Sequence, residues 1–460
     1  MCRYEGWGAH GMVKGIVSVD NDNQSQLPVT ERLRHRGAAT FSSLRIRNYR
    51  LFFIGQSISL PGTAMQTIAL SWLVLELTHS GTMIGLVLAA QFLPVSLFAA
   101  YGGVVADRVS KRPLIIVTQS IYGLLALTLG LLVLSHVVET WIVFVFAACL
   151  GLVASIDNPT RQSFMMEMVG GEHVQNAVSL NSVLVNGARS VGPAIAGALI
   201  ATVGVGICFL INAGSFIAAI TALSLIRSRE LTRSKPIERE PGQLREGLRY
   251  VRARSDLLVP LVMMALVGTL AYEFPVLLPL VAHDTLHSGA ETFGLLTTAM
   301  GVGAVSGGLV IAGLGWSGVQ RLTVAALAFG VAILLTAIAP TFSVMVVTLF
   351  FVGAASIAFM STGNSTLQLA STPRFRGRVM ALWAITFVGT TPIGGPLVGA
   401  ISEVRNPRYG LAVGGLACLV AATVGAITLR SGSGPAPTTT LCSDGEAVPT
   451  SLTGDLTDTL

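Results

Sequence analysis

The sequence contains few charged residues. Only 11% of its 460 residues are Asp, Glu, Lys or Arg, whereas a soluble globular protein carries roughly 25%. It also lacks the short alternating segments of a membrane barrel, because its apolar residues stand in long unbroken runs. The low charge and the 52% hydrophobic content exclude an ordinary soluble domain. They predict a polytopic α-helical membrane protein.

Several chemical signatures are also missing. The five cysteines show no metal-ligand spacing, and three of them lie in apolar runs (Cys2, Cys149, Cys208, Cys418, Cys442). We therefore predict no metal site and no disulfide framework. No nucleophile–base constellation indicates an enzyme, and no cofactor is expected. A phosphate-binding G-x-x-x-x-G-K-[ST] loop is absent, which argues against an ATP-driven pump.

The positive charge that is present stands in loops. The formal net charge of +6 would permit a nucleic-acid partner, but Lys and Arg flank the apolar runs. Membrane topology explains this placement more simply, so we expect a lipid bilayer and no nucleic acid as the surroundings of the chain.

Twelve apolar runs are long enough to span a bilayer, at about 20 residues for each span. The predicted spans are 50–76, 82–106, 113–136, 141–168, 175–202, 204–227, 257–283, 291–314, 320–339, 342–369, 376–403 and 408–430. The fold class is therefore an all-α membrane protein.

Polar segments divide the chain into five parts. The polar ends, 1–40 and 431–460, are predicted to be disordered cytoplasmic tails. We expect one six-helix bundle over 41–227 and another over 257–430. The arginine-rich segment 228–256 is predicted to be a cytoplasmic linker, with an amphipathic surface helix over 244–254.

Lys and Arg follow the positive-inside rule when both termini are cytoplasmic. They occupy the N-terminal tail, the loops after the even-numbered spans and the central linker, whereas the opposite loops hold only Arg405 and Arg408. This bias predicts a multi-pass protein of the cell membrane with both termini inside. We expect a monomer.

The loop between the second and third runs carries the densest charge, in a pattern formed by Gly103, Asp107, Arg108, Lys111 and Arg112. It resembles the helix 2–3 loop of the major facilitator superfamily, G-x-x-x-D-R-x-x-[RK]-[RK]. The resemblance implies a gating loop; the alternative is a charged turn that only fixes topology.

The two predicted bundles repeat a sequence pattern. Ser155-x-x-Asn158-x-Thr160-x-Gln162 matches Ser361-x-x-Asn364-x-Thr366-x-Gln368, and Gly192-Pro193 matches Gly395-Pro396. Parallel six-helix repeats that hold a substrate at their interface are the design of rocker-switch transporters. The Gly-Pro pairs predict helix kinks or close packing. The pair at 192–193 resembles the antiporter motif G-P-x-x-G-G of this superfamily.

Charged residues inside spans are costly and are candidate sites. Asp157 and Arg161 stand four residues apart, so they share a helix face and can pair. The segment 157–162 resembles the helix 4 signature of macrolide-efflux and enterobactin-exporter proteins. We predict that both residues join Glu167 and the Asp107 loop in one charge network at an inner gate; a static ion pair is the alternative.

Two further ionisable residues lie deeper in the predicted spans. Arg189 stands near the middle of helix 5 and needs a carboxylate, a group of carbonyls or an anionic ligand. Glu273, followed closely by Pro275, is our candidate for a carboxylate that binds a proton or a cationic substrate. The alternative for Glu273 is a vestibule residue without a coupling role. Polar residues that either line a cavity or pack between helices are Gln66, Gln91, Asn186, Asn364 and Gln368.

The resemblance to macrolide-efflux and enterobactin-exporter proteins extends over about 41–430. Asn48-Tyr49-Arg50-Leu51-Phe52 and Trp72-Leu73-Val74-Leu75-Glu76-Leu77-Thr78 also fit it. It implies a drug:proton antiporter that exports amphipathic small molecules with the proton gradient as its energy source. The alternatives are an exporter dedicated to one endogenous metabolite, such as a siderophore, and a membrane scaffold or sensor that transports nothing.

Overall fold

A computed structural model describes residues 42–232 and 243–430. Twelve helical segments in these ranges are long and apolar enough to cross a membrane, and the described residues contain no strand. The all-α prediction and the count of twelve spans are therefore confirmed. The predicted tails and part of the linker lie outside the described residues.

The first six spans form a group that we call the N half. Its helices are α3 (Arg47–Thr78), α4 (Gly81–Arg108), α5 (Lys111–Leu134), α6 (Thr140–Val203) and α7 (Val205–Ser224), with a short 3₁₀ turn, η1 (Ser42–Arg45), before them. Spans 4 and 5 run together in α6, because only Gly170 departs from helical geometry between them, with φ of 67°. A residue without a Cβ adopts this left-handed conformation at little cost.

The other six spans form the C half. Its helices are α9 (Ser255–Leu270), α10 (Phe274–Leu280), α11 (Ala290–Leu314), α12 (Val319–Ala337), α13 (Phe342–Ala370), α14 (Pro373–Val388), α15 (Thr391–Val404) and α16 (Pro407–Arg430), with a π-helical turn, η3 (Val281–Thr285), after α10. In the sequence, two short helices connect the halves, η2 (Ser228–Glu230) and α8 (Gln243–Arg252). The second lies in the region where a surface helix was predicted.

Spans 7 and 11 differ from the predicted continuous helices 257–283 and 376–403. Span 7 is interrupted between Leu270 and Phe274, and span 11 between Val388 and Thr391. Proline explains both positions: Pro275 and Pro392 occupy the first turn of the helix that follows, where a missing N–H costs nothing.

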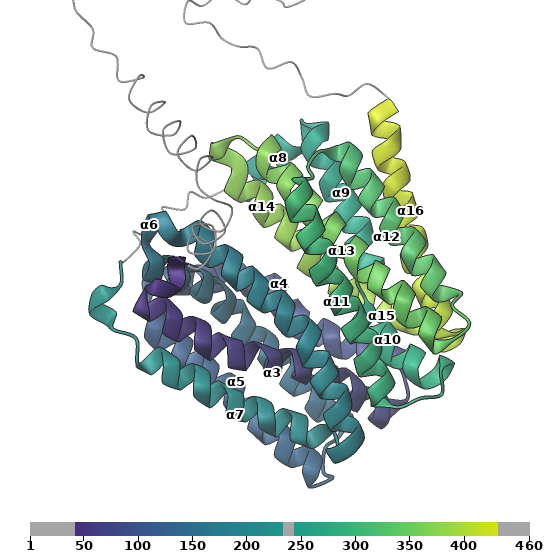
Figure 1. Cartoon of the computed structure of the whole chain (residues 1–460), viewed down its shortest axis with the longest axis horizontal. Helices are drawn as coiled ribbons and strands as arrows, with labels where there is room; N and C mark the ends of the chain where they lie inside the picture. The colour runs from purple at the N-terminus through teal and green to yellow at the C-terminus, as the bar shows by residue number, and fades with distance from the viewer. Residues whose placement is uncertain (1–41, 233–242, 431–460) are drawn as a thin grey trace, which may run out of the picture.

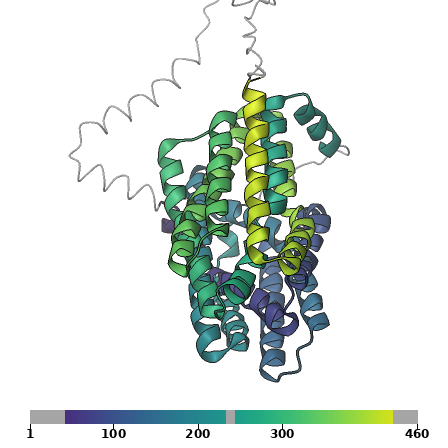
Figure 2. The ribbon, with the colours of Figure 1, turned by 90° about the vertical axis from the view of Figure 1, so that its right-hand side faces the viewer.

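The connections alternate between two ends of the molecule. We call the end that carries Ser42, α8 and the last residues of α16 the basic end, and the opposite end the far end. In Figure 1 the two halves lie together where α10 and α15 are labelled and diverge toward the end that carries α8. Figure 2 shows α16, in yellow, running along the C half toward the basic end.

Glycines allow the two halves to approach each other near the far end. Gly85 of α4 lies against the backbone of Gly395 in α15, and Gly197 of α6 lies against Gly294 of α11. Without side chains at these positions, two helix backbones pack closely, as is common between membrane helices. On the outside of the bundles, large apolar side chains such as Leu124 and Ile217 are exposed, which suits a lipid environment.

Candidate functional site: a helix 4 network, a buried carboxyl and a mid-span arginine

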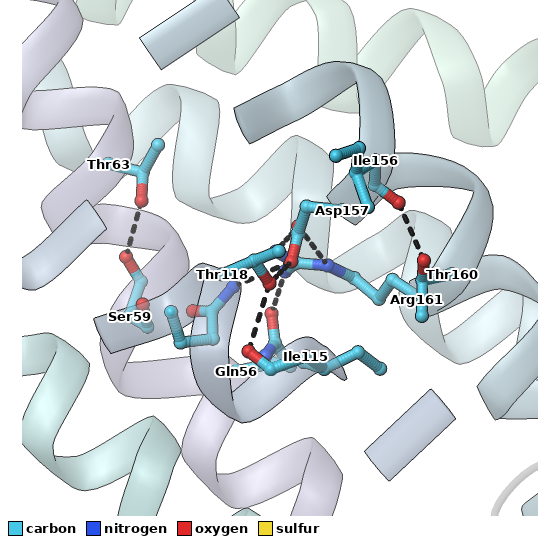
Figure 3. A network of polar contacts seen from close by, with 10 residues as sticks. Gln56, Ser59, Thr63, Ile115, Thr118, Ile156, Asp157, Thr160 and Arg161 are labelled. Carbon is cyan, nitrogen blue, oxygen red and sulfur yellow. Dashed lines mark hydrogen bonds and ion pairs between the residues drawn. The ribbon is translucent and has the colours of Figure 1, made fainter. Parts of the chain in front are cut away.

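Asp157 organises a polar network inside the N half (Figure 3). Its Oδ1 accepts hydrogen bonds from the Thr118 hydroxyl at 2.6 Å and from the Gln119 amide at 3.1 Å. Its Oδ2 pairs with Arg161 one turn further along α6. Arg161 also donates to Gln56 Oε1 of α3. The network therefore joins spans 1, 3 and 4, and the predicted pairing of Asp157 with Arg161 is present.

The charged loop forms a second cluster at the basic end. Lys111 Nζ lies 2.6 Å from Glu167 Oε1, and both side chains are more than nine-tenths buried. Arg112 donates to the carbonyl of Leu223, at 2.9 Å, and to that of Ser224, at the end of α7. The last carbonyls of a helix have no partner within it, so this arginine fixes the end of span 6 against span 3.

The described contacts divide the predicted network into two clusters, and the second contains the predicted contact between Glu167 and the charged loop. Ten residues of helix separate Asp157 from Glu167, which is about 15 Å along the axis, and their described contacts are to different residues. Asp107 and Arg108 end α4 near the Lys111 cluster. Gly103 lies in α4, and the preceding residue, Gly102, lies against the carbonyl of Ser155 in span 4. The gating role of this loop stays a prediction.

Glu273 lies in the interruption of span 7. It directly precedes α10, and only 1% of its surface is exposed. Its Oε1 is buried and has no hydrogen-bond partner among the described residues. A buried carboxylate without a partner is costly, so this position favours a group that takes up a proton or a ligand.

The interruption of span 11 lies beside that of span 7. Gly268 of α9 packs against Thr386 and Thr390, and Gly394 of α15 lies next to the Glu273 carboxyl. Gly395, which follows, also contacts Gly85 of the N half. The carboxyl therefore lies where two broken helices of the C half meet the N half. Interrupted helices near the centre of a membrane commonly form substrate and ion sites in transporters.

Kinks and close packing were the two roles predicted for the Gly-Pro pairs, and the structure shows close packing. The helix α6 runs without interruption through Gly192 and Pro193, and span 11 is broken before Gly395 and Pro396. Gly192 lies against Pro61 and Ala64 of α3. Both glycines therefore serve close packing, one within the N half and one between the halves.

Arg189 lies in span 5 with an exposed side chain, although its position is mid-span. It has no hydrogen bond or ion pair with any described residue. Its electrostatic neighbour is Tyr272, the residue before Glu273. The Tyr272 hydroxyl donates to the carbonyl of Ser356 at 2.8 Å. Arg189 is therefore within electrostatic range of span 7, in the other half.

The predicted cavity residues are distributed over both halves. Gln66 is buried and accepts a hydrogen bond from Asn212, so it packs between spans 1 and 6. Gln91 has a buried Oε1 without a partner among the described residues. Asn364 accepts from Gln368 on the same helix. The side chain of Asn186 lies outside those that the structure describes.

A model of the family described as transmembrane secretion effector, within the major facilitator superfamily, matches residues 38–434. The chain belongs to this family. The transporter is 26% identical to the enterobactin exporter EntS of Shigella boydii over 377 residues, which cover 81% of the chain and 89% of that protein. It is 24% identical to the staphyloferrin A transporter of Staphylococcus aureus over 263 residues. That match covers 57% of the chain and 66% of the relative, just under two thirds of its length.

Solved structures resemble the transporter in fold. A bacterial homologue of the human lysosomal transporter Spinster, in an inward-facing and occupied conformation, aligns with a TM-score of 0.67 over 85% of this chain and 98% of that one, at 14% identity. An inward-facing bacterial homologue of the iron transporter ferroportin aligns with a TM-score of 0.65 over 84% and 98%, at 16% identity. Together with the family match, they confirm the predicted major facilitator fold.

Sequence reasoning missed one charged contact of the transporter. Glu403, near the end of α15, accepts hydrogen bonds from Ser80 and Thr82 in the N half. Its carboxylate lies at the far end, close to a loop, and a charged residue at such a position does not by itself indicate a site. The available signal was the helix start Ser80-Gly81-Thr82, whose free N–H groups attract a carboxylate.

Proposed function

We propose that the transporter exports a small organic molecule in exchange for protons, by alternating access about the interface between the two halves. The basic end is assigned to the cytoplasm, as the distribution of Lys and Arg favours. No enzymatic reaction is assigned to it. The observation that carries the proposal is Glu273, a buried carboxyl where interrupted helices of one half meet the other; its Oε1 has no hydrogen-bond partner among the described residues.

A carboxyl at such a position can couple two transport steps. When it is charged, its burial is costly, and uptake of a proton removes that cost. Opening of the halves at the far end would separate Gly395 from Gly85 and change the surroundings of Glu273. The proton would therefore bind in one conformation more readily than in the other, which is the requirement for a coupled exchange.

The test uses the purified full chain in proteoliposomes that carry a pH-sensitive dye. The wild-type transporter is expected to move protons when a substrate gradient is imposed. The variant Glu273→Gln should move the substrate without protons, because it keeps the shape of the side chain and removes the group that binds the proton. Glu76→Gln is the matched control, because Glu76 is an acidic residue of the N half that already accepts a hydrogen bond from Trp72. Proton movement by Glu273→Gln at the wild-type rate would refute the coupling.

The names of the relatives favour a dedicated substrate over a broad range of drugs. The enterobactin exporter and the staphyloferrin A transporter are both named for siderophores. We therefore place export of a siderophore-like metabolite ahead of multidrug efflux. A deletion strain should lose one metabolite from its culture medium and keep its parent's susceptibility to a drug panel. Broad drug sensitivity with an unchanged medium would reverse this order, and an unchanged strain in both assays would favour a scaffold or sensor.

A further inference from the structure

Arg189 is a cation without a counter-charge among the described residues. Two other cations of the N half have carboxylate partners: Arg161 pairs with Asp157, and Lys111 pairs with Glu167. No ion pair joins Arg189 to the Glu273 carboxyl, whose Oε1 has no hydrogen-bond partner among the described residues. A charge in the middle of a membrane span is rare and usually has a partner or a function.

Helix geometry gives the direction of the Arg189 side chain. At 100° for each residue, Gly192 lies about 60° to one side of Arg189 on the helix and Gly197 about 80° to the other. Gly192 faces Pro61 and Ala64 of α3, and Gly197 faces Gly294 of α11. Arg189 therefore points between a helix of the N half and a helix of the C half. Its exposure and its interaction with Tyr272 agree with this direction.

The chemistry beside Arg189 indicates what it binds. A guanidinium presents a planar fork of N–H donors that matches two neighbouring oxygen atoms of an anion. Tyr272 of span 7 acts electrostatically on Arg189, and the ring of Phe387 packs edge-to-face against the Tyr272 ring, with the ring centroids 5.3 Å apart. Aromatic rings at this place provide a surface for the planar part of a ligand.

We propose that Arg189 binds an anionic group of the transported molecule, so that the substrate is an organic anion with two neighbouring oxygens. This inference rests on the proposed transport function and adds the substrate class. The guanidinium would hold the anion between the halves. Glu273, the residue after Tyr272, would then bind or release its proton when the anion is present.

Binding can be measured with two probes that differ mainly in charge. Salicylate is a planar aromatic carboxylate, and salicylamide is its neutral counterpart. We expect salicylate, but not salicylamide, to raise the melting temperature of the full chain in nanodiscs as its concentration increases. Arg189→Gln should weaken salicylate binding by about tenfold or more. The salicylate affinity of Arg189→Lys should lie between those of the wild type and Arg189→Gln, because an ammonium group keeps the charge but lacks the planar fork of donors.

A matched control is Arg252→Gln, at an exposed position of α8 away from the interface; it should bind salicylate as the wild type does. Equal binding of the two probes, absence of salicylate binding, or wild-type affinity in Arg189→Gln would each overturn the inference. If Arg189→Gln does not fold, wild-type affinity in Arg189→Lys overturns it instead. The two proposals can fail separately. If Arg189 does not bind salicylate but proton exchange depends on Glu273, the coupling proposal stands. If salicylate binds in a charge-dependent way but no protons are exchanged, the role of Arg189 stands and the coupling is refuted.

Discussion

The carboxylate of Glu403 accepts hydrogen bonds from both the hydroxyl and the backbone N–H of Thr82, at 2.6 and 3.1 Å. The Ser80 hydroxyl donates to the same oxygen at 2.7 Å. A carboxylate of the C half thus caps the first turn of α4 in the N half, where the free N–H groups and the helix dipole favour negative charge. These bonds cross between the halves, so alternating access requires them to break.

Glu403→Gln is expected to favour conformations that are open at the far end. Hydrogen bonds to a charged group contribute about 1.5–3 kcal/mol, and a loss of about 1.4 kcal/mol changes a two-state ratio tenfold. Spin labels at His136, in the connection between α5 and α6, and at Ser343, in the first turn of α13, would report the separation of the halves at the far end by double electron–electron resonance. We expect a larger population of long distances in the variant.

The control for this experiment is Glu139→Gln. Glu139 is a carboxylate at the same end, but its hydrogen bond, from Trp141 at 2.7 Å, stays within the N half. The distance distribution of this variant should match that of the wild type. Identical distributions in Glu403→Gln and Glu139→Gln would show that Glu403 does not stabilise the closed far end.

Gly85→Ala should disturb the same closure by a steric route. A methyl group at this position would meet backbone atoms of Gly395 and Pro396, which cannot turn aside as a side chain does. Overpacking of this kind costs about 1–3 kcal/mol. The variant should show long distances between the same spin labels and slower transport.

Gly313→Ala is the corresponding control, because a methyl group there meets no atom within 4 Å. Alanine also has the higher helix propensity, so this variant should fold and transport at least as well as the wild type. Short distances and normal transport in Gly85→Ala would mean that the two helices do not need this close approach.

Removal of the Asp157 charge should destabilise the N half through Arg161. Asp157→Asn leaves the guanidinium, whose side chain is 23% exposed, with Gln56 alone. The double variant Asp157→Asn/Arg161→Gln removes both charges and should regain part of the loss, with a coupling energy of about 0.5–3 kcal/mol. Melting temperatures of the two single variants and the double variant in detergent provide the measurement. Additive losses would show that the two side chains act independently.

The sequence correctly indicated the class and the helices because these depend on local properties. A run of about 20 apolar residues indicates a membrane span, and an acid and a base four residues apart share a helix face, which predicts the pair of Asp157 and Arg161. The interruption before α10 had a partial signal in Pro275. The interruption before α15 had a similar one in Pro392, which the interpretation did not use.

Contacts between distant segments could not be predicted in this way. The division of the charged residues into two clusters is one example: the helix rise of about 1.5 Å for each residue separates Glu167 from Asp157, whereas Lys111 reaches Glu167 from another helix. The partners of Gln66 and Glu403 lie 146 and more than 320 residues away in the chain.

Composition and the length of the apolar runs by themselves determined a twelve-span helical membrane protein, because the cost of placing polar groups in lipid acts on each segment separately. Only the tertiary structure decided which charges meet, that Glu273 is buried between two interrupted helices, and that Arg189 lacks a partner among the described residues. Those properties depend on how helices far apart in the sequence pack, and a linear pattern carries almost no information about that.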